Sequence, residues 1–131
     1  MNYKSLIIIL LLLTSCINNT DIIKHNTDSI KNLTKFSNSG FALIYDEKLF
    51  YEKIINTKMS DRDLIIFQKN LNKGTSVKIA NPANNKSLIA QVGKNSFYPN
   101  FNNSVISKRI ATDLELSVDE PFIVIEEIVH N

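Results

Sequence analysis

Residues 91–101, QVGKNSFYPNF, carry side chains suited to contact with a polar ligand. The segment holds one lysine, several amide and hydroxyl groups and three aromatic rings, and it contains no carboxylate. Amides and hydroxyls both donate and accept hydrogen bonds, and an aromatic ring adds a flat apolar face. We expect Lys94, Asn95 and Tyr98 to face a ligand. Because no carboxylic acid is present, the chemistry that these types favour is binding rather than proton transfer.

The first sixteen residues, MNYKSLIIILLLLTSC, predict export and lipid attachment. The apolar run 6–13 is far shorter than the roughly 20 residues of a membrane span and fits the core of a signal peptide. Residues 13–16, LTSC, match the bacterial lipobox, in which the cysteine thiol accepts a diacylglycerol. Cys16 is the only cysteine, so no disulfide can form within the chain. We therefore predict a signal peptide at 1–15 and a lipidated Cys16, against the alternative of an ordinary signal peptide with an incidental cysteine.

The segment after Cys16 predicts a tether that connects a membrane anchor to a domain. Residues 17–38 are rich in Asn, Thr, Ser, Lys and Asp, which favours a flexible chain with a reach on the order of 25 Å. Two or more acyl chains on Cys16 would anchor it stably. Ile17 rather than aspartate follows the cysteine, which resembles outer-membrane sorting in enteric bacteria. The expected location is the cell envelope, facing the periplasm, at the outer more than the inner membrane.

The charge and the histidines exclude several classes of partner. The net charge of +2 and the lack of a basic stripe argue against nucleic acid. His25 and His130 have no Cys or His at metal-ligand spacing, so we expect neither a metal nor a cofactor. The remaining residues, 39–131, suffice for one domain of ordinary size.

The distribution of strand-forming residues and turns in residues 40–128 predicts a small, mainly β domain. Residues 40–45 and 63–68 are rich in strand-forming types, and 75–81 and 87–93 predict a hairpin around the turn NPANNK. Residues 121–128 predict a closing strand that is apolar enough to be buried on both faces. Residues 107–116 predict a short helix with Ser107 as its N-cap; its buried face would hold Ile110, Ala111 and Leu114. Many short strands with one or two short helices indicate a β-barrel.

The hairpin LNKGTSVKIANPANNKSLIAQV, residues 71–92, resembles the rare lipoprotein A family. That family reads roughly L-P-L-G-T-x-V-x-V-T-N-x-x-N-G-x-S-v-x-V-x-V, and the two patterns align without a gap. The matching positions are Gly74, Thr75, Val77, Asn81, Asn84, Ser87 and Val92. Residues 40–45 are similar to the family's first strand, G-x-A-S-W-Y, and residues 106–115 to its helix, L-S-x-R-A-A-x-x-L-G. The resemblance covers about residues 40–128 and implies a six-stranded double-psi β-barrel.

Some members of that family are septal lytic transglycosylases, but this chain departs from their ionisable positions. Lys94 falls where the family has the aspartate of N-D-R-G-P, Val105 where it has a second aspartate, and Gln68 where it has a histidine. The reaction makes 1,6-anhydromuramyl ends and needs a positioned acid and base. Loss of one such group typically lowers a rate by roughly a hundred- to ten-thousandfold. The resemblance therefore implies a barrel that has lost the family's catalytic residues.

The interpretation that follows is a lipoprotein that binds peptidoglycan glycan strands without cleaving them. Its expected glycan-binding residues are Lys94, Asn95, Tyr98 and Gln68, while Phe97 and Phe101 are expected to pack their loop onto the barrel. One alternative is a lytic transglycosylase with a relocated acid, for which Asp46 and Glu47 are the least implausible candidates. The carboxylates at 61, 63, 113 and 115 are expected to be solvated. Another alternative is a protein-interaction module with a partner in the envelope.

Overall fold

The computed structural model describes residues 36–130, which form six strands and two short helices. The strands are β1 Ser37–Ile44, β2 Ile65–Phe67, β3 Ser76–Asn81, β4 Lys86–Val92, β5 Ser104–Ile106 and β6 Phe122–Glu127; the helices are α3 Glu47–Tyr51 and α4 Lys108–Asp113. The predicted signal peptide 1–15, Cys16 and residues 17–35 of the predicted tether lie outside the described residues. β1 begins at Ser37, so it takes in the last two residues of that tether. No helix among residues 36–130 combines the length and the hydropathy that a membrane span requires.

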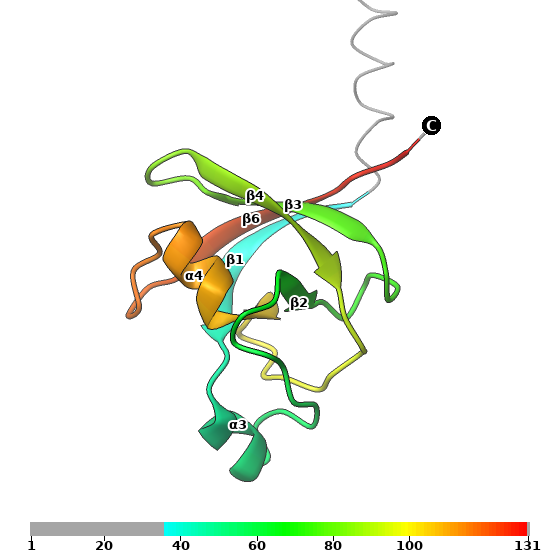
Figure 1. Ribbon diagram of the computed structural model, residues 1–131, viewed down its shortest axis with the longest axis vertical. Helices are drawn as coiled ribbons and strands as arrows, with labels where there is room; N and C mark the ends of the chain where they lie inside the picture. The colour runs from blue at the N-terminus through cyan, green and yellow to red at the C-terminus, as the bar shows by residue number, and fades with distance from the viewer. Residues whose placement is uncertain (1–35, 131) are drawn as a thin grey trace, which may run out of the picture. The chain divides into compact units, whose positions relative to one another are not determined.

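The strands close into a barrel in the order β1–β5–β2–β4–β3–β6 (Figure 1). β1 and β2 follow each other in the chain, yet β5 lies between them; β4 and β5 likewise enclose β2. The pairs β1–β5 and β2–β4 are parallel, whereas β2 and β5 are antiparallel. These two interlocked crossovers make the double-psi arrangement. The prediction of a mainly β, six-stranded double-psi barrel with one or two short helices is confirmed.

Alternation along the strands places one side-chain face inside the barrel. Val77 and Ile79 on β3, and Ile123 and Ile125 on β6, are fully buried. The prediction that the last strand is buried on both faces was wrong, because Phe122 on its outer face is 38% exposed. A closed barrel has only one inner face, so its strands alternate between core and solvent even where the outward residues are apolar.

Helix α4 forms as predicted and ends in a strained residue. The Ser107 hydroxyl accepts a hydrogen bond from the Ile110 amide at 3.2 Å, and Ile110 is buried. At the other end, the amides of Glu115 and Leu116 donate to the carbonyls of Thr112 and Ala111, both at 3.0 Å. This is a Schellman motif, which requires a left-handed residue that is usually glycine. Glu115 occupies that position with φ of 50°.

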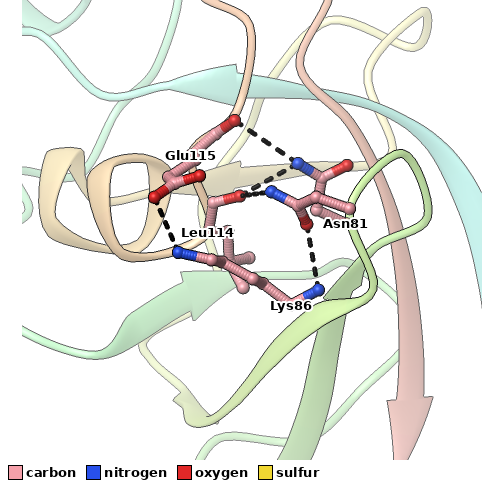
Figure 2. Close-up of polar contacts among 5 residues, drawn as sticks. Asn81, Lys86, Leu114 and Glu115 are labelled. Carbon is pink, nitrogen blue, oxygen red and sulfur yellow. Dashed lines mark hydrogen bonds and ion pairs between the residues drawn. The ribbon is translucent and has the colours of Figure 1, made fainter.

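The β3–β4 turn holds the end of α4 in place (Figure 2). The side-chain amides of Asn81 and Asn84 both donate to the backbone carbonyl of Leu114, at 2.9 and 3.0 Å. The Lys86 ammonium lies 2.6 Å from the Glu115 carboxylate. Two matched positions of the family pattern, Asn81 and Asn84, thus connect the hairpin to the helix.

Replacement of Glu115 by glycine is expected to stabilise the protein. The left-handed conformation costs a residue with a Cβ roughly 1–2 kcal/mol, whereas the exposed ion pair that would be lost contributes about 0–1 kcal/mol. We expect Glu115→Gly to raise the free energy of unfolding by roughly 0.5–1 kcal/mol in urea titration. Glu115→Gln, the control, keeps the strain and removes the charge, so its change should stay under about 0.5 kcal/mol. A less stable glycine variant would contradict the argument.

Candidate functional site

An open polar cavity of about 440 Å³ lies where β1, the end of β2 and the segment before β5 meet. Amide side chains dominate its wall: Asn38, Asn70, Asn100, Asn102, Asn103 and Gln68. Lys69, Tyr98 and Phe101 also line it, and no carboxylate is among its lining residues. The cavity is thus rich in groups that both donate and accept hydrogen bonds, and its formal charge is positive.

The barrel topology brings these three segments together. β5 lies beside both β1 and β2, so the residue that precedes it, Asn103, reaches both neighbours. The Asn103 amide donates to the Phe41 carbonyl on β1 at 3.0 Å. Its backbone carbonyl accepts hydrogen bonds from the side-chain amide of Gln68 and from the Tyr98 hydroxyl, both at 3.2 Å. Asn103 is therefore fixed to the strands on either side of it.

Two of the predicted binding residues, Gln68 and Tyr98, brace this junction rather than face solvent. They are only 3% and 2% exposed. The Tyr98 hydroxyl also accepts from the Lys69 amide at 3.0 Å, and its ring packs in an apolar cluster with Phe67 and Val105. The expectation that Tyr98 presents its ring to a sugar is corrected, because the ring completes the core below the cavity.

The other two predicted binding residues lie elsewhere. Lys94 and Asn95 are exposed, but neither lines the cavity that Gln68 and Tyr98 underlie. The chain leaves β4 at Gly93, where a Cβ would come within 2.7 Å of the Ile65 side chain. Gln68 and Tyr98 therefore lie together at this cavity, whereas Lys94 and Asn95 lie outside it.

Val105, aligned with a family aspartate, is fully buried on β5. Its neighbours in the apolar cluster are Tyr45, Ile55, Met59, Phe67 and Tyr98. No proton donor or acceptor is offered at this position.

Lys69 is a cavity residue that the sequence reasoning missed, although it directly follows Gln68. Its ammonium donates to the Tyr98 carbonyl at 2.9 Å and to the Asn100 side chain at 3.0 Å. It also lies 4.3 Å from the centroid of the Tyr98 ring. Within residues 36–130 no carboxylate comes within ion-pair distance of it. One of its three N–H groups remains for an anionic or carbonyl group of a ligand.

Phe101 presents an open aromatic face at the cavity edge. It is 79% exposed and stacks on Phe41 with 5.8 Å between ring centroids and 5° between ring planes. The expectation that Phe97 and Phe101 pack down was wrong, since Phe97 is also 62% exposed. A second hollow of about 630 Å³ shares Phe101 and Asn102 with the first and is also lined by Asp119 and Glu120. Phe101 therefore lies between two hollows.

Asp46, one of the two residues considered for a relocated acid, is engaged on the surface. Asp46 caps α3 by accepting from the Lys48 amide at 2.9 Å, and this bond, with Lys108 nearby, holds the pKa of Asp46 below its usual value. A lowered pKa is the opposite of what a general acid needs. Lys108 also approaches Asp61 at 3.6 Å, and Arg109 pairs with Asp113 at 3.4 Å. In the described part of the chain no three His, Cys, Asp or Glu side chains gather as a metal site.

No protein-family model matches the chain, and no curated protein is significantly similar to it in sequence. The likeness to the rare lipoprotein A family therefore depends on the residues quoted above, and the barrel is the fold that this likeness implies.

The buried phenol of Tyr98 predicts a loss of stability at alkaline pH. Burial raises the pKa of Tyr98 above its usual 10.0, partly offset by the hydrogen bond from the Lys69 amide. The folded state thus holds the proton more tightly, so the stabilisation is complete below about pH 10 and is lost as pH rises through the folded pKa. At neutral pH, Tyr98→Phe should cost about 1–2 kcal/mol in urea titration. The difference in free energy of unfolding between this variant and wild type should narrow by pH 11. A difference that does not depend on pH would contradict the raised pKa of Tyr98.

Proposed function

We propose that the protein is a lipid-anchored lipoprotein of the cell envelope whose barrel binds peptidoglycan glycan strands without cleaving them. The observation that carries the proposal is the exposed Phe101 ring between an amide-rich cavity and a second hollow. A sugar ring presents an apolar C–H face that can stack on an aromatic ring, and its edge carries hydroxyl and acetamido groups that amides can bond. A strand that crosses Phe101 would place successive sugars in the two hollows.

Lys69 supports a wall glycan over a neutral one. The lactyl group of muramic acid ends in a carboxylate where no stem peptide is attached, and stem peptides carry carboxylates of their own. The Lys69 ammonium lines the polar cavity and has no carboxylate partner among residues 36–130. A ligand carboxylate could therefore be attracted without displacing an existing ion pair.

The residues around the cavity argue against cleavage there. Its wall contains no carboxylate, and Val105 is enclosed in the core. The alternative, a lytic transglycosylase with a relocated acid, has one observation in its favour: two carboxylates, Asp119 and Glu120, line the adjoining hollow beside Phe101. The same binding surface would serve both, so product analysis decides between them.

The membrane anchor and the location complete the proposal. A lipid on Cys16 and a tether up to residue 36 would hold the barrel within reach of the wall from the periplasmic face of a membrane. The lipobox at 13–16 is the support for this part.

Binding to sacculi should depend on Phe101 and not on Phe97. The purified full chain in mild detergent is expected to sediment with isolated sacculi. Phe101→Ala should weaken retention about tenfold, which corresponds to about 1.4 kcal/mol. Phe97→Ala is the matched control, because Phe97 is a similarly exposed ring that lines neither hollow. Equal retention of the two variants would remove the role of Phe101. Complete absence of retention, with a protein captured by crosslinking in the envelope, would favour an interaction module.

Incubation with glycan strands freed of stem peptides should release no 1,6-anhydromuramyl products by mass spectrometry. The reason is the lack of a carboxylate in the polar cavity. Appearance of anhydro ends would favour the lytic alternative. In that event replacement of Asp119 and Glu120, the carboxylates of the second hollow, by Asn and Gln should abolish them, while Glu115→Gln, which lines neither hollow and is paired with Lys86, should not.

A further inference from the structure

Two buried polar atoms of the cavity wall lack hydrogen-bond partners. Among the described residues, the Asn38 Oδ1 and the Asn103 Nδ2 are the buried side-chain atoms without one. One is an acceptor and the other a donor, and both residues line the same cavity. Buried polar groups are nearly always paired with protein, ligand or ordered water, so these two atoms mark where a bound group would find a donor and an acceptor.

The strand geometry places these atoms on one side of β1. Asn38 and Gly40 are two residues apart on β1, so they face the same way. The Asn103 side chain lies against Gly40: a Cβ there would be 3.2 Å from the Asn103 Cβ and 3.5 Å from its Nδ2. The absence of a side chain at residue 40 thus leaves room for the Asn103 amide beside Asn38.

The Asn103 side-chain amide has a hydrogen-bond partner at one of its two polar atoms. Its Oδ1 accepts a hydrogen bond from the Ser104 hydroxyl at 2.9 Å, which leaves Nδ2 as the free end. Its backbone is fixed by Phe41, Gln68 and Tyr98, as described above. The backbone of Asn103 is therefore fixed, while its Nδ2 has no partner.

We propose that Asn103 and Asn38 form a recognition site for a secondary amide, with the Asn103 Nδ2 donating to the ligand carbonyl and the Asn38 Oδ1 accepting from the ligand N–H. A secondary amide carries one acceptor and one donor, which complements the unpaired set. A hydroxyl combines both functions on one oxygen, whereas a secondary amide separates them over two atoms, and the probes below distinguish the two classes. The inference rests on the proposed function in that the acetamido group of a wall sugar is one source of such an amide. A peptide bond of a stem peptide is the other.

Three soluble probes separate these sources without any variant. N-acetylglucosamine tetramer and glucose tetramer share a backbone and differ at C2, where the first carries the acetamido group and the second a hydroxyl. An acetyl-capped alanine dipeptide amide supplies secondary amides without a sugar. With the full chain in mild detergent, calorimetry should give at least tenfold tighter binding of the acetylated tetramer than of the glucose tetramer. Preference for the dipeptide over both sugars would support the amide site and assign its ligand to peptide.

Two isosteric variants test the direction of each hydrogen bond. Asn103→Asp replaces the donor by an acceptor and should lower the affinity for the preferred amide probe about tenfold. Asn38→Asp retains an acceptor oxygen, so its affinity for the same probe should stay within about threefold of wild type. Asn38→Leu removes the acceptor and should lower that affinity about tenfold, as Asn103→Asp does. Unchanged thermal midpoints would exclude misfolding as the cause.

Equal affinity for the two tetramers together with no binding of the dipeptide would overturn the inference, as would equal effects of the two aspartate variants. Retention on sacculi would then still stand, so the glycan-binding proposal would survive. Loss of sacculus retention with a preserved preference for an amide probe would instead overturn the glycan proposal and leave the amide site.

Discussion

The carbonyl of Asn103 is the junction on which the candidate site depends. It accepts hydrogen bonds from the side-chain amide of Gln68, which follows β2, and from the hydroxyl of Tyr98, in the segment before β5. The backbone amide of Asn103 donates to the backbone carbonyl of Phe41 on β1. These bonds exist because β5 is inserted between β1 and β2, which are consecutive in the chain. A crossover that is a property of the whole barrel therefore places three separate segments around one cavity. Changes at Gln68 or Tyr98 would act on the cavity through Asn103.

The sequence predicted those parts of the fold whose causes are local. The β3–β4 hairpin follows from alternation and a turn, and α4 follows from the Ser107 cap with Ile110 at helical spacing. Strand β5 has three residues, all buried, and is defined only by its neighbours β1 and β2. Helix α3 has five residues, none of them buried, so it leaves little periodic signal. The same distinction holds in the site: the burial of Tyr98 depends on partners 29 and 5 residues away, at Lys69 and Asn103.

The positions that differ from the resembling family have a physical role here. Gln68, aligned with a histidine, uses its amide to donate to Asn103 and its oxygen to accept from the Asn70 amide. Val105, aligned with an aspartate, lies among apolar side chains, where a charged group would be costly. Glu115, aligned with a glycine, keeps the left-handed turn and gains an ion pair with Lys86. In the described barrel, Gln68 and Val105 therefore serve bracing and packing, and Glu115 forms part of a surface turn.

Three departures from ordinary packing lie around one cavity. An unpaired buried polar atom costs about 1–3 kcal/mol, a large fraction of the 5–15 kcal/mol that a domain of this kind has in total. Asn38 and Asn103 each carry one such atom, and Phe101 next to them leaves most of its ring in water. Local departures from consistency mark functional sites, because the free protein bears a cost that a bound ligand removes. A ligand that covers Phe101 and pairs both asparagines would remove all three departures at once, which is why a single extended ligand accounts for them better than separate causes.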